Sequence, residues 1–201
     1  NSKTVLYRIG EDPKKRNVVF DAASFPELGI DTKDYPVAKL IKNNDTYLIG
    51  YVSNSSTNWD AFYTPLDAVL SNKKITWKPL FTREDKVVKN SGKFNDNQFI
   101  YKTAKGASNF KIAAVDINTP DFKNPSVLVE ERPDETINDF VVTKEGLFFT
   151  TVKNGVEAKL FQVTDQTEKR IKVPKVSGQI AISAKGKEDP NVMVSIKGWS
   201  S

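Results

Sequence analysis

The sequence contains neither cysteine nor histidine. Without cysteine there is no disulfide framework, no thiolate zinc site and no cysteine nucleophile. Without histidine, a Ser-His-Asp triad lacks the imidazole that takes and returns a proton near neutral pH. The chain also has no Gly-x-Ser-x-Gly nucleophile elbow. We therefore expect this chain to have no catalytic activity of its own, and we predict neither a metal ion nor a cofactor for it.

Long apolar runs and blocks of one charge are missing as well. No run of about 18 apolar residues is present, so no membrane helix is predicted. The 30 lysines and arginines are mixed with 25 acidic residues, and no basic-plus-aromatic signature indicates a nucleic-acid partner. The absence of cysteine fits cytoplasm and periplasm equally. The first residues contain neither an initiator methionine nor a signal-peptide core, so we expect a processed chain or a piece of a longer protein.

A β-hairpin pattern is clearest in the middle of the chain. The apolar run Phe99–Tyr101 is followed by a small-residue turn over 103–109 and by a second run from Phe110 to Val115. Two such runs joined by a Gly-containing connection are typical of a hairpin with a longer loop. Phe110, Ile112 and Ala114 alternate with Lys111 and Ala113, which predicts a half-buried second strand.

The hairpin pattern recurs at a regular spacing. The second strand of each unit is centred near Leu48, Ile100, Phe148 and Met193, at steps of 52, 48 and 45 residues. Four short strands in about 40–50 residues is the repeat size of β-propeller blades. In the second unit we expect Val87-Val88 to form the first strand. A β-sandwich also has many short strands and stays the alternative, but the periodicity favours blades.

The predicted fold class is therefore all-β, a partial β-propeller of four-stranded antiparallel blades. Residues 1–201 form a single propeller fragment with about three full blades and a half blade at each end. Its predicted parts are an outer half blade with a loop, three blades and an inner half blade, which span residues 1–36, 37–86, 87–134, 135–175 and 176–201.

Several segments resemble the prolyl oligopeptidase family of serine peptidases. Val5-Leu-Tyr-Arg-Ile-Gly-Glu-Asp12 and Asn17-Val-Val-Phe-Asp21 are similar to a family stretch in which an aromatic and basic pair precedes Leu-Gly-Thr and a Val-Phe-Glu strand. The segment from Phe99 to Ile112 resembles Phe-x-x-Thr-Asn-x-x-Ala-Pro-x-x-Arg-Leu. Asp116-Ile-Asn-Thr-Pro120 then matches Asp-Leu-x-x-Pro, and Val129-Glu-Glu131 matches Ile-Pro-Glu.

Three positions depart from the family pattern, which implies a divergent member. Ser126 stands where the family usually has tryptophan, and Ser108 replaces a proline. Thr64 lies where some members carry a substrate-facing cysteine. The resemblance implies that this chain is the C-terminal half of the N-terminal propeller, without the catalytic α/β-hydrolase domain.

The resemblance also implies a function. A propeller placed over a hydrolase pocket admits short peptides and excludes folded proteins, so the implied partners are the α/β-hydrolase peptidase domain of the parent chain and peptide substrates. By family position Thr64 would face the substrate, with Trp59 and Tyr63 beside it; strand packing is the alternative for all three. The alternative function is a stand-alone β-propeller or β-sandwich that binds proteins or glycans.

The predicted half blades have a consequence for assembly. Closure is what hides strand edges in a propeller, and a partial propeller leaves edges open. We therefore expect an edge-mediated homo-oligomer.

Overall fold

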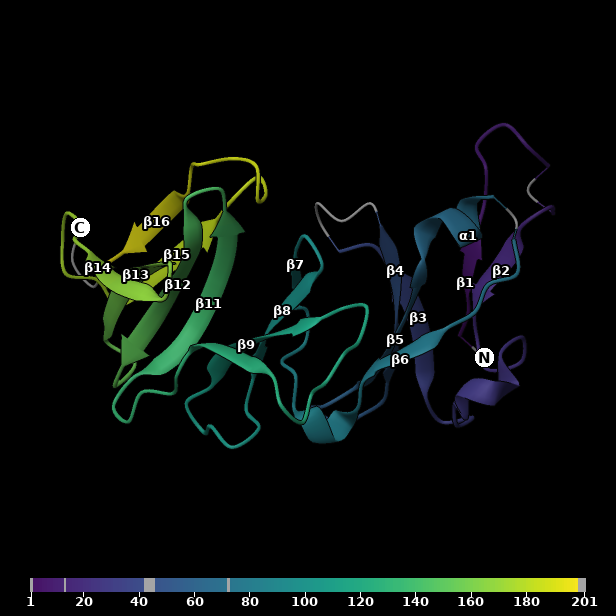
Figure 1. Ribbon diagram of the computed structural model, residues 1–201, viewed down its shortest axis with the longest axis horizontal. Helices are drawn as coiled ribbons and strands as arrows, with labels where there is room; N and C mark the ends of the chain where they lie inside the picture. The colour runs from purple at the N-terminus through teal and green to yellow at the C-terminus, as the bar shows by residue number, and fades with distance from the viewer. Residues whose placement is uncertain (1, 13, 42–45, 72, 199–201) are drawn as a thin grey trace. The chain divides into compact units, whose positions relative to one another are not determined.

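The computed structural model describes residues 2–12, 14–41, 46–71 and 73–198, and its regular structure is almost entirely β (Figure 1). The strands form five antiparallel sheets, and within each sheet they pair in chain order. Three sheets have four strands each, and the first and last sheets of the chain have two. This confirms the predicted fold class, a partial β-propeller of three complete blades with half a blade at each end.

The strand bounds follow the chain from one sheet to the next. The first sheet contains β1 (Thr4–Leu6) and β2 (Asn17–Phe20). The three complete sheets are β3 (Tyr35–Lys39), β4 (Tyr47–Ser53), β5 (Asp60–Pro65) and β6 (Lys78–Phe81); β7 (Lys93–Asn95), β8 (Gln98–Thr103), β9 (Lys111–Asp116) and β10 (Ser126–Val129); and β11 (Thr136–Thr143), β12 (Gly146–Lys153), β13 (Glu157–Thr164) and β14 (Thr167–Ile171). The last sheet contains β15 (Gln179–Ser183) and β16 (Met193–Lys197).

Helical structure is confined to short connections. The α-helix α1 (Leu66–Leu70) follows β5, and single 3-10 turns span Pro26–Leu28 and Arg83–Asp85. None of the helices in the described part of the chain is long and apolar enough to cross a membrane. The chain divides into two compact units, residues 1–89 and 90–201.

In the first unit, the half blade β1–β2 packs on the sheet β3–β6. The ring of Phe20 is fully buried, and its centroid lies 4.5 Å from that of Trp77. Gly50 on β4 makes room for this ring, since a Cβ at position 50 would lie 2.6 Å from the nearest atom of Phe20. The core of this unit is therefore a contact between two sheets, as in successive propeller blades.

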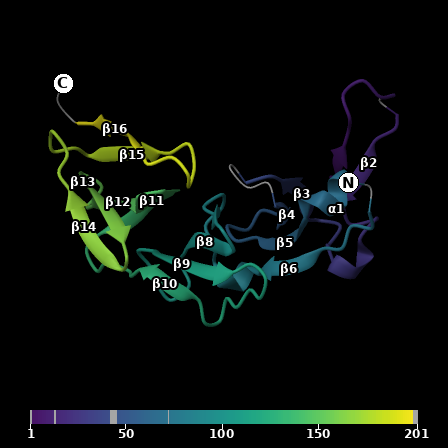
Figure 2. The ribbon, with the colours of Figure 1, turned by 45° about the horizontal axis from the view of Figure 1, so that its top comes forward.

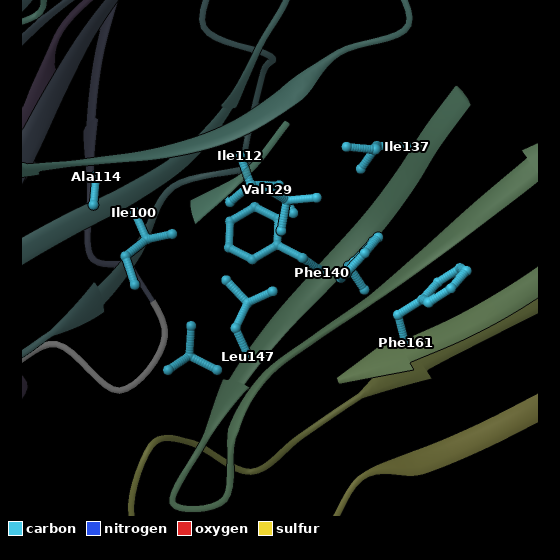
Figure 3. Close-up of a cluster of buried hydrophobic side chains, with 10 residues drawn as sticks. Ile100, Ile112, Ala114, Val129, Ile137, Phe140, Leu147 and Phe161 are labelled. Atoms are coloured by element: carbon cyan, nitrogen blue, oxygen red, sulfur yellow. The ribbon is translucent and has the colours of Figure 1, made fainter. Parts of the chain in front are cut away.

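In the second unit, the sheet β11–β14 is buried on both faces. Phe140, Phe149 and Phe161 are directly paired across β11, β12 and β13, so their side chains share one face. This face packs against Ile112 and other residues of β8, β9 and β10 (Figure 3). On the opposite face, Leu160 belongs to a cluster with residues of β15 and β16, and Figure 2 shows β15 beside β11–β13.

The predicted central hairpin is present, with two corrections. β8 and β9 pair through Phe99↔Val115 and Tyr101↔Ala113. Phe110 was expected in the second strand but lies before it, with a left-handed φ of 66° that ends the loop. The expectation of a half-buried strand is also wrong, because Ala113 is as buried as Ile112. Four consecutive residues of β9, from Ile112 to Val115, are buried, so the strand does not show the alternation of a half-buried strand.

The expected strand at Val87-Val88 is absent. The first strand of the second complete sheet is β7, five residues later in the chain. Lys86 and Asn90, with φ of 49° and 59°, turn the backbone on either side of the two valines. Val87 is nevertheless buried, so its apolar character serves packing in the link between sheets.

Candidate functional site

The three residues predicted to face a substrate lie on or next to β5. Thr64 is fully buried, with 0 % of its surface exposed, and Tyr63 is 4 % exposed. As neighbours on one strand they point to opposite faces of the sheet. Tyr63 packs edge-on against Tyr47, with ring centroids 5.6 Å apart. Trp59 precedes β5 and is half-buried. The structure therefore does not gather the three side chains on one surface, and their contact with a substrate stays a prediction.

Trp59 lies between an aromatic ring and an ammonium group. Its ring packs against that of Tyr51 at a centroid distance of 6.0 Å, and Lys89 Nζ lies 4.3 Å from the Trp59 centroid. Burial raises the pKa of Tyr51 to about 12, so its phenol stays neutral. A cation over an indole face is attracted by the ring quadrupole. Trp59 is thereby held in one orientation at the start of β5.

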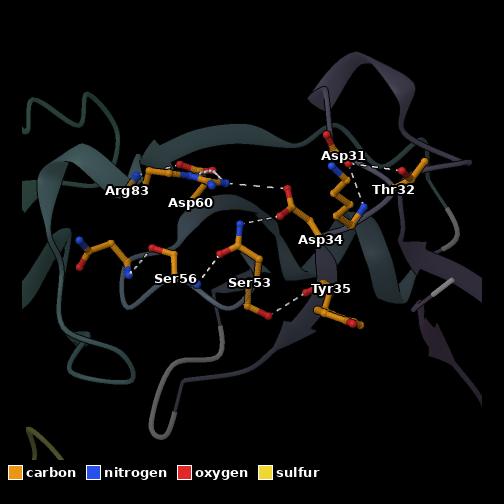
Figure 4. A network of polar contacts seen from close by, with 11 residues as sticks. Asp31, Thr32, Asp34, Tyr35, Ser53, Ser56, Asp60 and Arg83 are labelled. Carbon is orange, nitrogen blue, oxygen red and sulfur yellow. Dashed lines mark hydrogen bonds and ion pairs between the residues drawn. The ribbon is translucent and has the colours of Figure 1, made fainter.

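An ion-pair network occupies the same end of the sheet β3–β6. Arg83 donates from Nε and Nη2 to Asp60 Oδ2 at 2.9 and 2.5 Å, and its main-chain N–H donates to Asp60 Oδ1 at 2.8 Å (Figure 4). Asp34 Oδ2 lies 3.8 Å from Arg83 Nη2. Asn54 Nδ2 donates to Asp34 Oδ1 at 2.8 Å. We call Asp34, Asn54, Asp60 and Arg83 the Arg83 network.

The Arg83 network joins segments that are far apart in the sequence. It connects the start of β3, the end of β4, the start of β5 and the turn after β6. The hydrogen bonds and charge of Asp60 raise the pKa of Arg83, so the guanidinium is always charged. The side chain of Arg83 is still 40 % exposed. The guanidinium of Arg83 is therefore fixed in position, charged and partly exposed to solvent at this end of the sheet.

The β4–β5 loop, residues 54–59, is ordered by its own polar groups. Asn54 Oδ1 accepts a hydrogen bond from the main-chain N–H of Ser56 at 2.7 Å, and Ser56 Oγ accepts one from that of Asn58 at 3.2 Å. Lys89 Nζ donates to the carbonyl of Ser56 at 3.3 Å. Side chains that bond to nearby main-chain groups stabilise such turns. These hydrogen bonds therefore hold the loop, and with it Trp59, in a defined position.

Sequence patterns alone did not indicate Asp34, Asn54, Asp60, Arg83 or Lys89. One local signal was available for Arg83. Thr82 and Asp85 form a capping box, in which each side chain bonds to the other residue's main-chain N–H. That pattern starts a short helical turn, and it fixes the backbone at Arg83. The pairing of Arg83 with Asp60 depends on the register of β5 against β6, which the predicted blade does not specify.

The arrangement supports binding and shows no cluster suited to a metal. In the described part of the chain, no three acidic side chains are grouped closely enough to hold a metal ion. At this end of the sheet, Arg83 forms ion pairs with Asp60 and Asp34, and the ammonium group of Lys89 lies over Trp59. Ion-pair networks of this kind occur both in structural surfaces and in functional sites.

Comparisons with known proteins identify the family. Residues 1–200 match the family described as the prolyl oligopeptidase N-terminal β-propeller domain. The match covers nearly the whole chain. The chain belongs to this family. No curated protein sequence matches it.

Solved structures show the same fold. The chain is similar to prolyl oligopeptidase B from Galerina marginata, with 13% identity, a TM-score of 0.69, and coverage of 98% of this chain and 26% of that one. A post-proline cleaving enzyme from Rickettsia typhi is 14% identical, with a TM-score of 0.67 and coverage of 96% and 28%. The chain thus spans about a quarter of the length of the solved structures that it matches.

Proposed function

We propose that this chain is the substrate-gating, non-catalytic part of a prolyl-oligopeptidase-like serine peptidase. The chemistry would be done by an α/β-hydrolase domain of the parent protein, acting on short peptides. The observation that supports this most is the family match over residues 1–200. The lack of histidine and cysteine supports it further, since the two commonest activated nucleophiles in peptidases need one or the other.

A propeller contributes to peptidase action by controlling access. A cover over a hydrolase pocket excludes water and bulky substrates while chemistry proceeds underneath. Rigid sheets are suited to this role, because packed blades do not deform to admit a folded protein. The selectivity of the parent enzyme would then depend on the size of the substrate as well as on its sequence.

Trp59, Tyr63 and Thr64 are the substrate-facing residues of this proposal. Trp59 would be the most accessible of the three to a peptide, because it is half-buried whereas Tyr63 and Thr64 are buried. Arg83, held by Asp60, lies at the same end of the sheet and adds a fixed positive charge. Trp59 would offer a flat apolar surface and Arg83 hydrogen-bond donors, and an extended peptide can use both.

The test compares two substrates of the parent enzyme that share one cleavage sequence. The first is a short unstructured peptide containing proline, and the second is a stable folded protein that carries the same sequence in an exposed loop. The proposal expects cleavage of the peptide and at least a hundredfold lower kcat/KM for the folded protein. Equal values for the two substrates would overturn the gating role. Edge-mediated self-association of the isolated chain, expected from the half blades, is a separate proposal.

A further inference from the structure

A hollow of about 920 Å³ lies along β2 in the first unit. Two stretches of four consecutive residues line it, 16–19 at the start of β2 and 73–76 between α1 and β6. Four extended residues span up to about 13 Å, so the hollow is long enough for several residues of another chain. We call it the β2 hollow. Its described lining includes no residue of β1, of the Arg83 network or of the predicted substrate-facing set, so it is a separate feature.

The floor of the β2 hollow is apolar and fixed in shape. Val19, Phe25 and Val69 line it, and all three are buried members of the core of the first unit. Ile75 also lines the hollow and packs against the same core. Core side chains are closely packed and hold their positions. The hollow is therefore preformed, and its floor offers apolar contact to a ligand.

The rim of the β2 hollow is basic. The sequence has three runs of adjacent basic residues, at 14–16, 73–74 and 169–170. Two of these runs reach the hollow, through Arg16, Lys73 and Lys74, while Glu27 is the one acidic residue in the described lining. Within the ranges that the structure describes, the side chains of Arg16 and Lys74 form no ion pair. Their charges are therefore available to an anionic partner.

A hydrogen bond joins the two sides of this rim. Arg8, in the loop that leads to Arg16, donates from Nη2 to the carbonyl of Leu70 at the end of α1, 2.7 Å away. The loop before β2 is thereby tied to α1, which leads into residues 73–76. This contact holds the two basic runs near each other.

One carboxylate is already bound at the rim. Lys73 Nζ lies 2.9 Å from Asp67 Oδ2 of α1, and both side chains are largely exposed, at 66 % and 77 %. An exposed ion pair of this kind contributes little to stability, so a carboxylate of a ligand can take the place of Asp67. Asp67 thus marks the chemical group that the rim binds, and it is a built-in competitor for that group.

We propose that the β2 hollow docks an extended, acidic segment of another polypeptide. Apolar side chains of that segment lie on the floor, and its carboxylates pair with Arg16, Lys73 and Lys74. Opposite charges steer such a partner to the hollow and orient it there. This inference goes beyond the gating function and does not depend on it.

The lining favours a polypeptide over other anionic partners. Polar side chains interrupt the apolar lining at Asn17, Ser24 and Thr76, which suits main-chain amides and acidic side chains and not a lipid tail. The one aromatic ring in the described lining, that of Phe25, is only 8 % exposed. Recognition of single-stranded nucleic acid uses accessible aromatic rings on which bases stack, and the hollow offers none in its described lining.

The experiment measures binding of a short labelled peptide in which glutamate alternates with valine. Fluorescence anisotropy with the purified 201-residue chain gives the Kd. Arg16→Gln combined with Lys74→Gln should weaken binding about tenfold, because two ion pairs are lost. Lys33→Gln combined with Lys123→Gln is the matched control, because it removes the same charge from exposed positions outside the hollow, and it should leave the Kd unchanged.

Asp67→Asn gives a result in the opposite direction. It removes the competing carboxylate from Lys73, so the peptide should bind about two- to fivefold more tightly. Raising the salt concentration should weaken binding to the wild type, since exposed charges are screened. Circular dichroism verifies that every variant is folded.

A change in the peptide tests the floor while the protein stays the same. Serine in place of each valine should weaken binding at least about tenfold, because apolar contacts are lost. Absence of binding by the glutamate–valine peptide, equal binding of the serine version, or equal weakening by the Lys33 and Lys123 control would overturn the proposal. Tighter binding of dodecanoate or inorganic phosphate than of the peptide would assign the hollow to a lipid or a small anion and would equally overturn it. None of these readouts involves peptide cleavage, so the gating proposal stands or fails separately.

Discussion

The indole Nε1 of Trp77 donates a hydrogen bond to the main-chain carbonyl of Val19, 3.1 Å away and 58 residues earlier in the chain. This buried bond joins the half blade β1–β2 to the sheet β3–β6. Trp77→Phe keeps an aromatic ring but leaves the Val19 carbonyl without this donor, so we expect a loss of about 1–3 kcal/mol in the free energy of unfolding.

Trp59→Phe is the matched control for that measurement. The Trp59 Nε1 is also buried, but it has no hydrogen-bond partner in the described part of the chain. Removing it should change the free energy of unfolding by less than about 1 kcal/mol. Urea titration of both variants compares them directly. Equal losses would show that ring volume, and not the hydrogen bond to Val19, determines the effect.

Two adjacent threonines on β12 provide a second matched pair. Thr150 and Thr151 are both fully buried. Thr151 Oγ1 donates to Glu135 Oε2 at 2.6 Å, whereas Thr150 Oγ1 has no partner among the described residues. Thr151→Val should therefore cost about 1–3 kcal/mol, and Thr150→Val should be neutral or stabilising. Thermal unfolding measures both, and a larger loss for Thr150→Val would contradict the assignment.

Glu135 should make stability depend on pH in the acid range. Burial alone would raise the pKa of Glu135, but the hydrogen bonds from Lys159 and Thr151 outweigh it and hold the pKa below the ordinary value of 4.5. A carboxylate with a lowered folded pKa contributes stability above its unfolded pKa and loses it as the pH falls through the folded pKa. Unfolding of Glu135→Gln should thus differ most from the wild type near pH 7.

The difference between Glu135→Gln and the wild type should shrink steadily as the pH falls below about 4.5, the ordinary value of the group. Glu11→Gln is the control, because Glu11 is exposed, and its stability profile should follow the wild type. A gap between Glu135→Gln and the wild type that stays constant down to pH 2 would contradict the role of the Glu135 charge.

Gly50 and Phe20 are expected to be energetically coupled. A Cβ at position 50 would lie 2.6–3.0 Å from three atoms of the Phe20 ring, so Gly50→Ala should cost about 1–3 kcal/mol by overpacking. Adding Phe20→Leu removes the clash, and the double variant should be less destabilised than the sum of the two single changes. If urea titration gives additive losses, the close contact with Phe20 is not the cause of the destabilisation by Gly50→Ala.

The fold was predictable because its signal is repeated. Apolar runs around Leu48, Ile100 and Phe148 recur with turn residues between them, and each became the second strand of a complete sheet. Local backbone geometry was harder to predict than the fold. Lys86 and Phe110, which have left-handed φ angles, are examples. Lys86 ends the 3-10 turn that starts at Arg83, and the main-chain N–H of Phe110 closes a turn on the carbonyl of Ala107, while their residue types carry no turn signal.

The candidate site was predictable only in part. Trp59 was named because it lies near Thr64 in the sequence; it directly precedes β5, and its contact with a substrate stays a prediction. The Arg83 network was not predictable from the sequence, because strand pairing brings together Asp34, Asp60 and Arg83, which span 49 residues of sequence. Thr64 was chosen through a family position, and its complete burial depends on tertiary packing, which local sequence does not reveal.

The central claim is that this chain is a propeller module without chemistry of its own. The most direct test incubates the purified 201-residue chain with a fluorogenic peptide that contains proline, beside the parent enzyme at the same concentration. The account predicts turnover by the parent enzyme and a rate for the chain equal to that of buffer. Turnover that stays with the folded chain through size-exclusion chromatography, and disappears when the chain is unfolded, would contradict it.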